Sequence, residues 1–99
     1  PEFAEKLGSF LGEGGLLPWE DAKDLIADAT RLVEREATLE RVQVPAGAHI
    51  NVVGDVHGQL FDLLHLLALH GPPSAENPYI FNGDFVDRGS FSLETLLVL

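Results

Sequence analysis

The apolar positions in the first half of the chain repeat at helical spacing, which predicts two helices. The first group comprises Phe3, Leu7, Phe10 and Leu11. Several glycines then interrupt the pattern, and Pro18 suits the first position of a second helix. That helix carries one apolar stripe, formed by Trp19, Ala22, Leu25, Ile26, Ala29, Leu32 and Val33. We therefore expect residues 1–47 to form a leading helical segment.

The second half of the chain alternates between short strands and helices. Residues 50–53 are short, apolar and β-branched, which predicts a buried strand. Residues 59–70 form a helix that is apolar on most faces, and residues 79–81 form a second strand. A last helix, capped by Ser90, follows the second strand. The order strand, helix, strand predicts a parallel pair with a right-handed crossover, so the fold class is α/β.

Composition and charge restrict the classes of partner. The chain has 99 residues, of which 45% are hydrophobic, so we expect at most one small packed domain. Its formal net charge is −10, from 16 acidic and 6 basic residues, which argues against nucleic acid and anionic membranes as partners. The absence of cysteine excludes disulfides and thiolate metal sites, and it permits a reducing compartment. Such an acidic protein needs cations to bind phosphate.

Both predicted strands end in a Gly-Asp pair, at Asp55 and Asp84. Paired strands lie about 4.8 Å apart, so the two carboxylates would leave one sheet edge side by side and repel each other without a cation. His57 would point to the same side if its loop is extended. Oxygen and imidazole ligands together suit Mn, Fe or Zn better than Ca or Mg. The alternative is that both Asp residues only form turns and that His57 is a loop histidine with satisfied hydrogen bonds. It is less favoured because the pattern occurs after both strands.

Arg88 is the only lysine or arginine after Arg41. A guanidinium binds phosphoryl oxygens with two parallel hydrogen bonds, and two divalent ions beside it would convert an acidic cleft into a phosphate site. The alternative is an ion pair with Asp84 or Asp87, and charge alone does not separate the two interpretations. The remaining histidines are interpreted as structural: His49, His65 and His70.

Two motifs resemble a known family. Residues 54–59 (Gly-Asp-Val-His-Gly-Gln) and 83–89 (Gly-Asp-Phe-Val-Asp-Arg-Gly) are similar to the first two signature motifs of the phosphoprotein phosphatases, which are metallophosphoesterases. The flanking residues 77–82 and 90–92 most resemble the type 5 subfamily of serine/threonine protein phosphatases. The resemblance is specific over about residues 50–94.

The resemblance implies a fold, a reaction and a set of residue roles. The fold would be part of the metallophosphatase sandwich, with residues 48–99 as its metal-binding strand-helix-strand unit. The reaction would be hydrolysis of phosphoserine and phosphothreonine monoesters in proteins by water that two divalent metal ions activate. Asp55 and His57 would bind the first metal, and Asp84 would bridge both. Asp87 and Arg88 would be catalytic: Arg88 would hold the substrate phosphate, and Asp87 would orient a catalytic histidine.

That histidine belongs to a third motif, Gly-Asn-His-Glu, which residues 1–99 do not contain. The chain also ends within an apolar run, so we expect it to be the N-terminal part of a catalytic domain, inactive and incompletely folded by itself. The resemblance implies phosphorylated protein substrates, a cytoplasmic or nuclear location, and chaperone-linked partners through an upstream helical-repeat region. Alternatives are another metallophosphoesterase, such as a diadenosine-tetraphosphate hydrolase, or a non-catalytic truncation. The sequence beyond Leu99 would separate these hypotheses.

Overall fold

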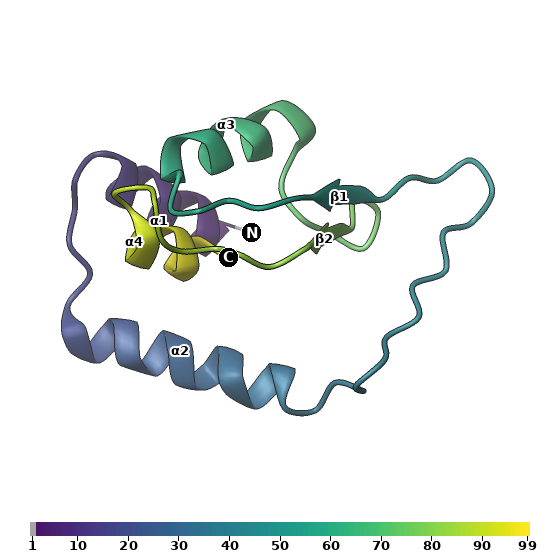
Figure 1. The fold of residues 1–99 in the computed structure, drawn as a ribbon, viewed down its shortest axis with the longest axis horizontal. Helices are drawn as coiled ribbons and strands as arrows, with labels where there is room; N and C mark the ends of the chain where they lie inside the picture. Colours follow the sequence, from purple (N-terminus) through teal and green to yellow (C-terminus); the bar gives the residue numbers. More distant parts are fainter. Residues whose placement is uncertain (1) are drawn as a thin grey trace.

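The computed structural model of the chain describes residues 2–99, so Pro1 lies outside it. The described elements are α1 (Glu2–Gly12), α2 (Trp19–Val33), β1 (Asn51–Val53), α3 (Leu60–His70), β2 (Tyr79–Phe81) and α4 (Ser92–Val98). Figure 1 shows the order expected from the sequence, with two leading helices followed by strand, helix, strand and helix. The α/β class is therefore confirmed. The division of the chain at residue 47 stays a prediction.

The second helix begins one residue later than predicted. Pro18 has φ −54° and ψ 143°, so it precedes the helix as its N-cap and is not the first helical residue. Its carbonyl accepts the first helical hydrogen bond, from the amide of Ala22 at 3.0 Å. Glu20 and Asp21 lie in the first turn, where carboxylates interact favourably with the helix dipole.

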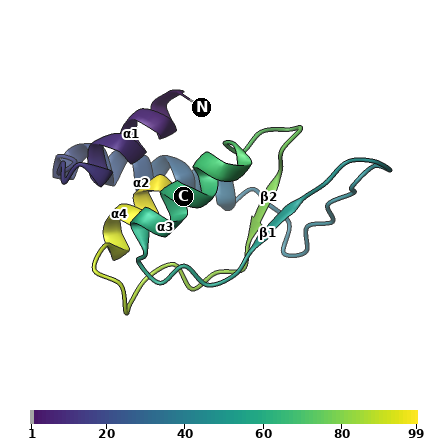
Figure 2. The same cartoon turned by 90° about the horizontal axis from the view of Figure 1, so that it is seen from above.

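The core lies where α1, α3 and α4 meet. Figure 2 shows these helices gathered at one end of the molecule, with the two strands at the other. The buried apolar cluster consists of Leu7, Leu11, Ala22, Leu60 and Leu97. At Gly8 a Cβ atom would lie only 2.8 Å from Cδ2 of Leu64, so glycine permits the close approach of α1 to α3. The helices thus form a small core that supports one end of the strand-helix-strand unit.

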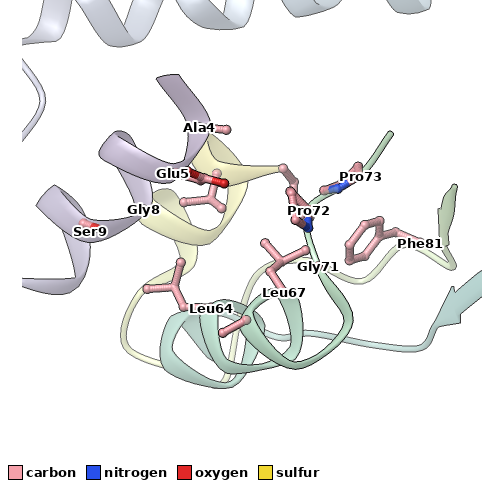
Figure 3. A pocket seen from close by; sticks show the side chains of 13 residues that line it. Ala4, Glu5, Gly8, Ser9, Leu64, Leu67, Gly71, Pro72, Pro73 and Phe81 are labelled. Atoms are coloured by element: carbon pink, nitrogen blue, oxygen red, sulfur yellow. The ribbon is translucent and has the colours of Figure 1, made fainter. Parts of the chain in front are cut away.

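The core is bordered by open apolar hollows. One of about 620 Å³ lies between α1, α3 and the end of α4, and Figure 3 shows Leu64, Leu67 and Phe81 among its lining side chains. A second of about 510 Å³ lies between α1, α2 and α4. Along the apolar stripe of α2 only Ala22 is buried, and Trp19 is 71% exposed. Residues 2–99 therefore do not close their own core.

The two strands pair in parallel, as predicted. Val52 lies opposite Ile80 in the register, and Asn51 and Val53 lie opposite Tyr79 and Phe81. The prediction that residues 50–53 form a buried strand is wrong in its burial, because Val52 is 70% exposed. Alternate residues of a strand face opposite sides of the sheet, and no part of the described chain covers the side of Val52.

The helices that follow the strands differ in small ways from the sequence expectations. Gln59 is the N-cap of α3, and Gly71, with φ 80°, ends that helix. The predicted role of Ser90 as a cap is wrong, because α4 begins at Ser92 after Phe91. The amide of Thr95 donates the first bond of α4 to the carbonyl of Phe91 at 2.9 Å, which leaves Ser90 outside the helix. Within residues 2–99 no helix is long and apolar enough to cross a membrane.

Candidate metal centre

The loops that follow the two strands are joined to each other through their backbones. The amides of Val56 and His57 both donate to the carbonyl of Asp84, at 3.1 and 2.9 Å. Gly58 donates to the carbonyl of Phe85 at 2.8 Å. Figure 1 shows the two loops running side by side from the strands toward α3 and α4. These bonds, formed between residues far apart in the sequence, fix the side chains of one loop relative to those of the other.

Gly58 and Gly89 permit this close contact. The amide of Gly89 donates to the carbonyl of His57 at 2.8 Å. A Cβ atom at Gly89 would overlap the carbonyl oxygen of His57 and lie 2.6 Å from backbone atoms of Gly58. Gly58 has φ 67°, a region that favours glycine, and its Cβ would lie 3.1 Å from the carbonyl oxygen of Gly89. The close contact between the two loops therefore explains why both positions carry glycine.

The structure brings together the three residues expected to bind metal. One potential ligand atom from each of Asp55, His57 and Asp84 lies within 4.8 Å of the others. Nε2 of His57 is 3.7 Å from a carboxylate oxygen of Asp55 and 3.6 Å from one of Asp84. The imidazole is 17% exposed, whereas the two carboxylates are 54% and 59% exposed. The cluster therefore has a sheltered imidazole on one side and two accessible carboxylates on the other.

His57 is oriented by a contact that the sequence did not indicate. Its φ is 48°, so the expectation of an extended loop is wrong. Instead, Nδ1 lies 2.9 Å from the carbonyl oxygen of Val86. A carbonyl only accepts, so Nδ1 donates this hydrogen bond, and Nε2 is the ring atom that faces the two carboxylates. A hydrogen bond from the far ring nitrogen is typical of metal-binding histidines, so this donor set fits a divalent cation.

Asp87 and Arg88 lie in the same loop, with an unusual backbone. In residues 2–99 the non-glycine residues with positive φ are His57, Asp84, Asp87 and Arg88, at 48°, 56°, 67° and 65°. All four belong to the five residues that the sequence analysis selected, and such strain gathers at functional sites. Within the described part of the chain Arg88 forms no salt bridge, so its ion pair with Asp84 or Asp87 is not formed here. The functional roles of all five residues stay predictions.

The other histidines do not join this cluster. His49 bonds through Nε2 to Oδ1 of Asn77 at 2.9 Å, in a contact between the two strand starts. His65 and His70 are exposed on α3. Sequence reasoning missed Ser92, whose hydroxyl accepts a hydrogen bond from the amide of Asp87 at 3.0 Å. In the sequence, the only indication of this contact is that Ser92 follows Asp87 and Arg88 closely.

Ligand sites of α/β sheets lie outside the carboxyl ends of parallel strands, which is where Asp55, His57 and Asp84 gather. The sequence model of the calcineurin-like phosphoesterase family matches residues 48–99. The chain belongs to this family. The match covers both strands and both loops of the candidate metal centre.

Similar proteins agree with the expected subfamily. The chain is 51% identical over 78 residues to serine/threonine-protein phosphatase 5 of Arabidopsis thaliana, which covers 79% of this chain and 14% of that protein. It is also 43% identical over 98 residues to serine/threonine-protein phosphatase T of Schizosaccharomyces pombe. That alignment covers 99% of this chain and 21% of the relative.

A solved structure supports the fold as well. A serine/threonine phosphatase from Saccharomyces cerevisiae, described as similar to human phosphatase PP5, superposes with a TM-score of 0.83 at 36% identity. The superposition covers 89% of this chain and 29% of that one. The chain therefore has the fold of this part of the yeast phosphatase, and it spans about a fifth or less of the two curated relatives' length.

Proposed function

We propose that this chain is part of a serine/threonine protein phosphatase that hydrolyses phosphoserine and phosphothreonine monoesters in proteins. The observation that carries the proposal is the cluster of Asp55, His57 and Asp84, in loops that also hold Arg88, which forms no ion pair within residues 2–99. The names of the relatives, all protein phosphatases, favour this reaction over hydrolysis of a dinucleotide.

Asp55, His57 and Asp84 would hold divalent metal, with Asp84 shared between two ions. Mn, Fe or Zn suits this mixture of carboxylate oxygen and imidazole nitrogen. When bound, the ions supply positive charge for the phosphoryl oxygens and lower the pKa of water. The cluster contains two carboxylates, so without cations it would repel a phosphate dianion.

Arg88 would bind the phosphate of the substrate through its guanidinium. The side chain is exposed and forms no ion pair within residues 2–99, so its donors are available to a ligand. A guanidinium matches two phosphoryl oxygens at once and orients the ester as well as neutralising it. The neighbouring Asp87 would orient a histidine from a segment outside this chain, as its family motif implies.

The complete enzyme would extend beyond residues 1–99. This follows from the relatives, of whose length the chain spans 14% to 21%. Its substrates would be phosphorylated proteins in the cytoplasm or nucleus, and an upstream helical-repeat region would bind chaperone-linked partners. These features depend on the subfamily resemblance alone.

The test compares variants of the full-length protein that contains this chain. With Mn present, the wild type should release phosphate from phosphoserine peptides. Arg88→Ala should lower kcat/KM by about 10²-fold with normal metal content, because it removes a donor to the developing charge. Arg41→Ala is the matched control, since Arg41 is exposed and outside both loops.

Two outcomes would reject the assignments. A wild-type protein that binds Mn but hydrolyses only diadenosine tetraphosphate contradicts the proposed reaction. Loss of metal from Arg88→Ala would instead assign Arg88 as an ion-pair partner of the carboxylates. Asp84→Asn provides the comparison for metal loss, and it should lose both metal and activity.

A further inference from the structure

The turn at Asp87 and Arg88 requires support from its surroundings. Both residues have left-handed φ values, of 67° and 65°. Such a conformation costs about 1–3 kcal/mol for each non-glycine residue, and it persists only where neighbouring groups hold it. Both residues are exposed, so burial of their own side chains does not hold the turn. Hydrogen bonds to the backbone are the remaining source.

Three such bonds hold the turn. The amide of Gly89 is shared between the carbonyls of His57 and Asp87, at 2.8 Å each, and the amide of Asp87 donates to Oγ of Ser92 at 3.0 Å. Within residues 2–99 the Ser92 hydroxyl is the only side-chain group that bonds to the backbone of residues 87–89. Substitution of Ser92 therefore removes a support of the turn without changing any residue within the turn.

Ser92 is itself firmly placed. It is the first residue of α4, whose residues Thr95 and Leu97 are buried in the helical end of the molecule. A Cβ atom at Gly58 would lie 2.9 Å from Oγ of Ser92 and 3.1 Å from its amide nitrogen, so the serine packs directly against the loop of His57. Within residues 2–99 the hydroxyl bonds to the amide of Asp87 and not to the backbone of α4.

From this geometry we propose that Ser92 is a positioning residue, which holds the Asp87–Arg88 turn in the orientation that Arg88 needs to bind phosphate. The proposal rests on the phosphate-binding role of Arg88 proposed above. Without the hydroxyl, the amide of Asp87 loses its partner, and the turn is free to relax toward negative φ. The guanidinium then moves relative to the metal cluster. Two-point binding of phosphate is sensitive to such movement, and a displacement of about 1 Å can cost about 10²-fold in rate.

The metal cluster has supports besides this hydrogen bond. The Val86 carbonyl that orients His57 shares a peptide unit with the Asp87 amide, but the two loops are also joined through the carbonyl of Asp84, which accepts from Val56 and His57. Loss of the Ser92 hydroxyl should therefore weaken phosphate binding more than metal binding. Loss of a residue with a purely structural role would instead lower the stability of the protein without this preference for phosphate binding.

The experiment uses the full-length protein and three variants. In Ser92→Ala, kcat/KM for a phosphoserine peptide should fall about 10-fold, and the Ki of inorganic phosphate should rise by a similar factor. Metal content and thermal midpoint should stay close to the wild type. Ser92→Thr keeps the hydroxyl and should recover most of the loss. Ser90→Ala makes the same change at an exposed serine outside α4 and should behave as the wild type.

The outcomes separate this inference from the proposed function. Wild-type activity that Ser92→Ala leaves unchanged, in both kcat/KM and phosphate Ki, overturns the inference alone. A lower thermal midpoint with unchanged Ki in the folded protein assigns Ser92 a structural role, and this also overturns it. A wild-type protein without phosphatase activity defeats the proposed function, and the inference with it.

Discussion

Asp84, Asp87 and Arg88 adopt left-handed backbone conformations in a loop that has glycine at both ends, Gly83 and Gly89. Glycine at all positions would relieve the strain, but it would also remove the carboxylates and the guanidinium. The loop instead keeps charged side chains at positions where glycine is favoured, at a cost of about 1–3 kcal/mol each. The placement of these side chains therefore comes at a cost in stability.

Thr95 has a polar side chain in an apolar environment. Its side chain is fully buried, and within residues 2–99 its Oγ1 has no hydrogen-bond partner. A buried unsatisfied hydroxyl costs about 1–3 kcal/mol, and valine has nearly the same shape. We predict that Thr95→Val stabilises the catalytic domain of the full-length protein by about 1 kcal/mol. Urea unfolding measures this change.

Thr95→Ser is the control, because it keeps the hydroxyl and removes a buried methyl group. It should destabilise the protein by about 1 kcal/mol. A valine variant that is less stable than the wild type would show that Oγ1 has a partner in the full-length protein.

At the scale of the elements, Asn77 joins the end of α3 to the starts of both strands. Its Nδ2 lies 2.9, 3.2 and 3.0 Å from the carbonyl oxygens of His70, Gly71 and Pro72. Its Oδ1 accepts hydrogen bonds from Asn51 at 2.8 Å and from His49 at 2.9 Å. Carbonyls at a helix end have no partner within the helix, so this amide satisfies the carbonyl of His70, while that of Gly71 also accepts from the hydroxyl of Tyr79 at 2.8 Å.

We predict that Asn77→Ala lowers the stability of the domain by about 2 kcal/mol, since it removes several hydrogen bonds worth about 1 kcal/mol each. Thermal unfolding of the full-length protein measures the effect. Asn82→Ala is the matched control, because Asn82 is exposed and its side chain makes no hydrogen bond within residues 2–99. Equal midpoints for the two variants would contradict the role of Asn77.

At the scale of the whole molecule, residues 2–99 are arranged more openly than a compact domain. The radius of gyration is 14.1 Å, compared with about 13 Å expected for a compact domain of 100 residues. Apolar hollows of about 620 and 510 Å³ border the small core, and Figure 2 shows the strand pair extending from the helices. Two strands with open edges are only marginally stable without further cover.

We therefore predict that a protein consisting of residues 1–99 alone is inactive and lacks fixed tertiary packing. Its described cluster offers three candidate metal ligands, and residues 1–99 do not contain the third family motif, which would supply the general acid. Loss of a general acid typically costs about 10²–10⁴-fold in rate. Phosphate release with excess Mn and the cooperativity of thermal unfolding are the two measurements.

The two measurements answer different questions. Rapid phosphate release by this short chain would overturn the proposed roles of the groups outside it. A sharp unfolding transition without turnover would leave those roles intact and contradict the incomplete fold.

The sequence by itself determined the elements, their order and the cluster of site residues. Helical periodicity placed α1, α2 and α3 to within about two residues of their observed bounds. The Gly-Asp pair after each strand placed Asp55 and Asp84 together, because neighbouring parallel strands end at one edge. These features follow from local spacing and from one general rule of sheet geometry.

Only the tertiary structure decided how the site is held and which faces are covered. The ring of His57 is oriented by Val86, and the amide of Asp87 by Ser92. Val52 is exposed although its strand is apolar, because burial depends on what packs against a face. Local spacing encodes which side of an element is apolar. It does not encode the hydrogen bonds between loops about 30 residues apart, which form only when strand pairing brings their backbones together.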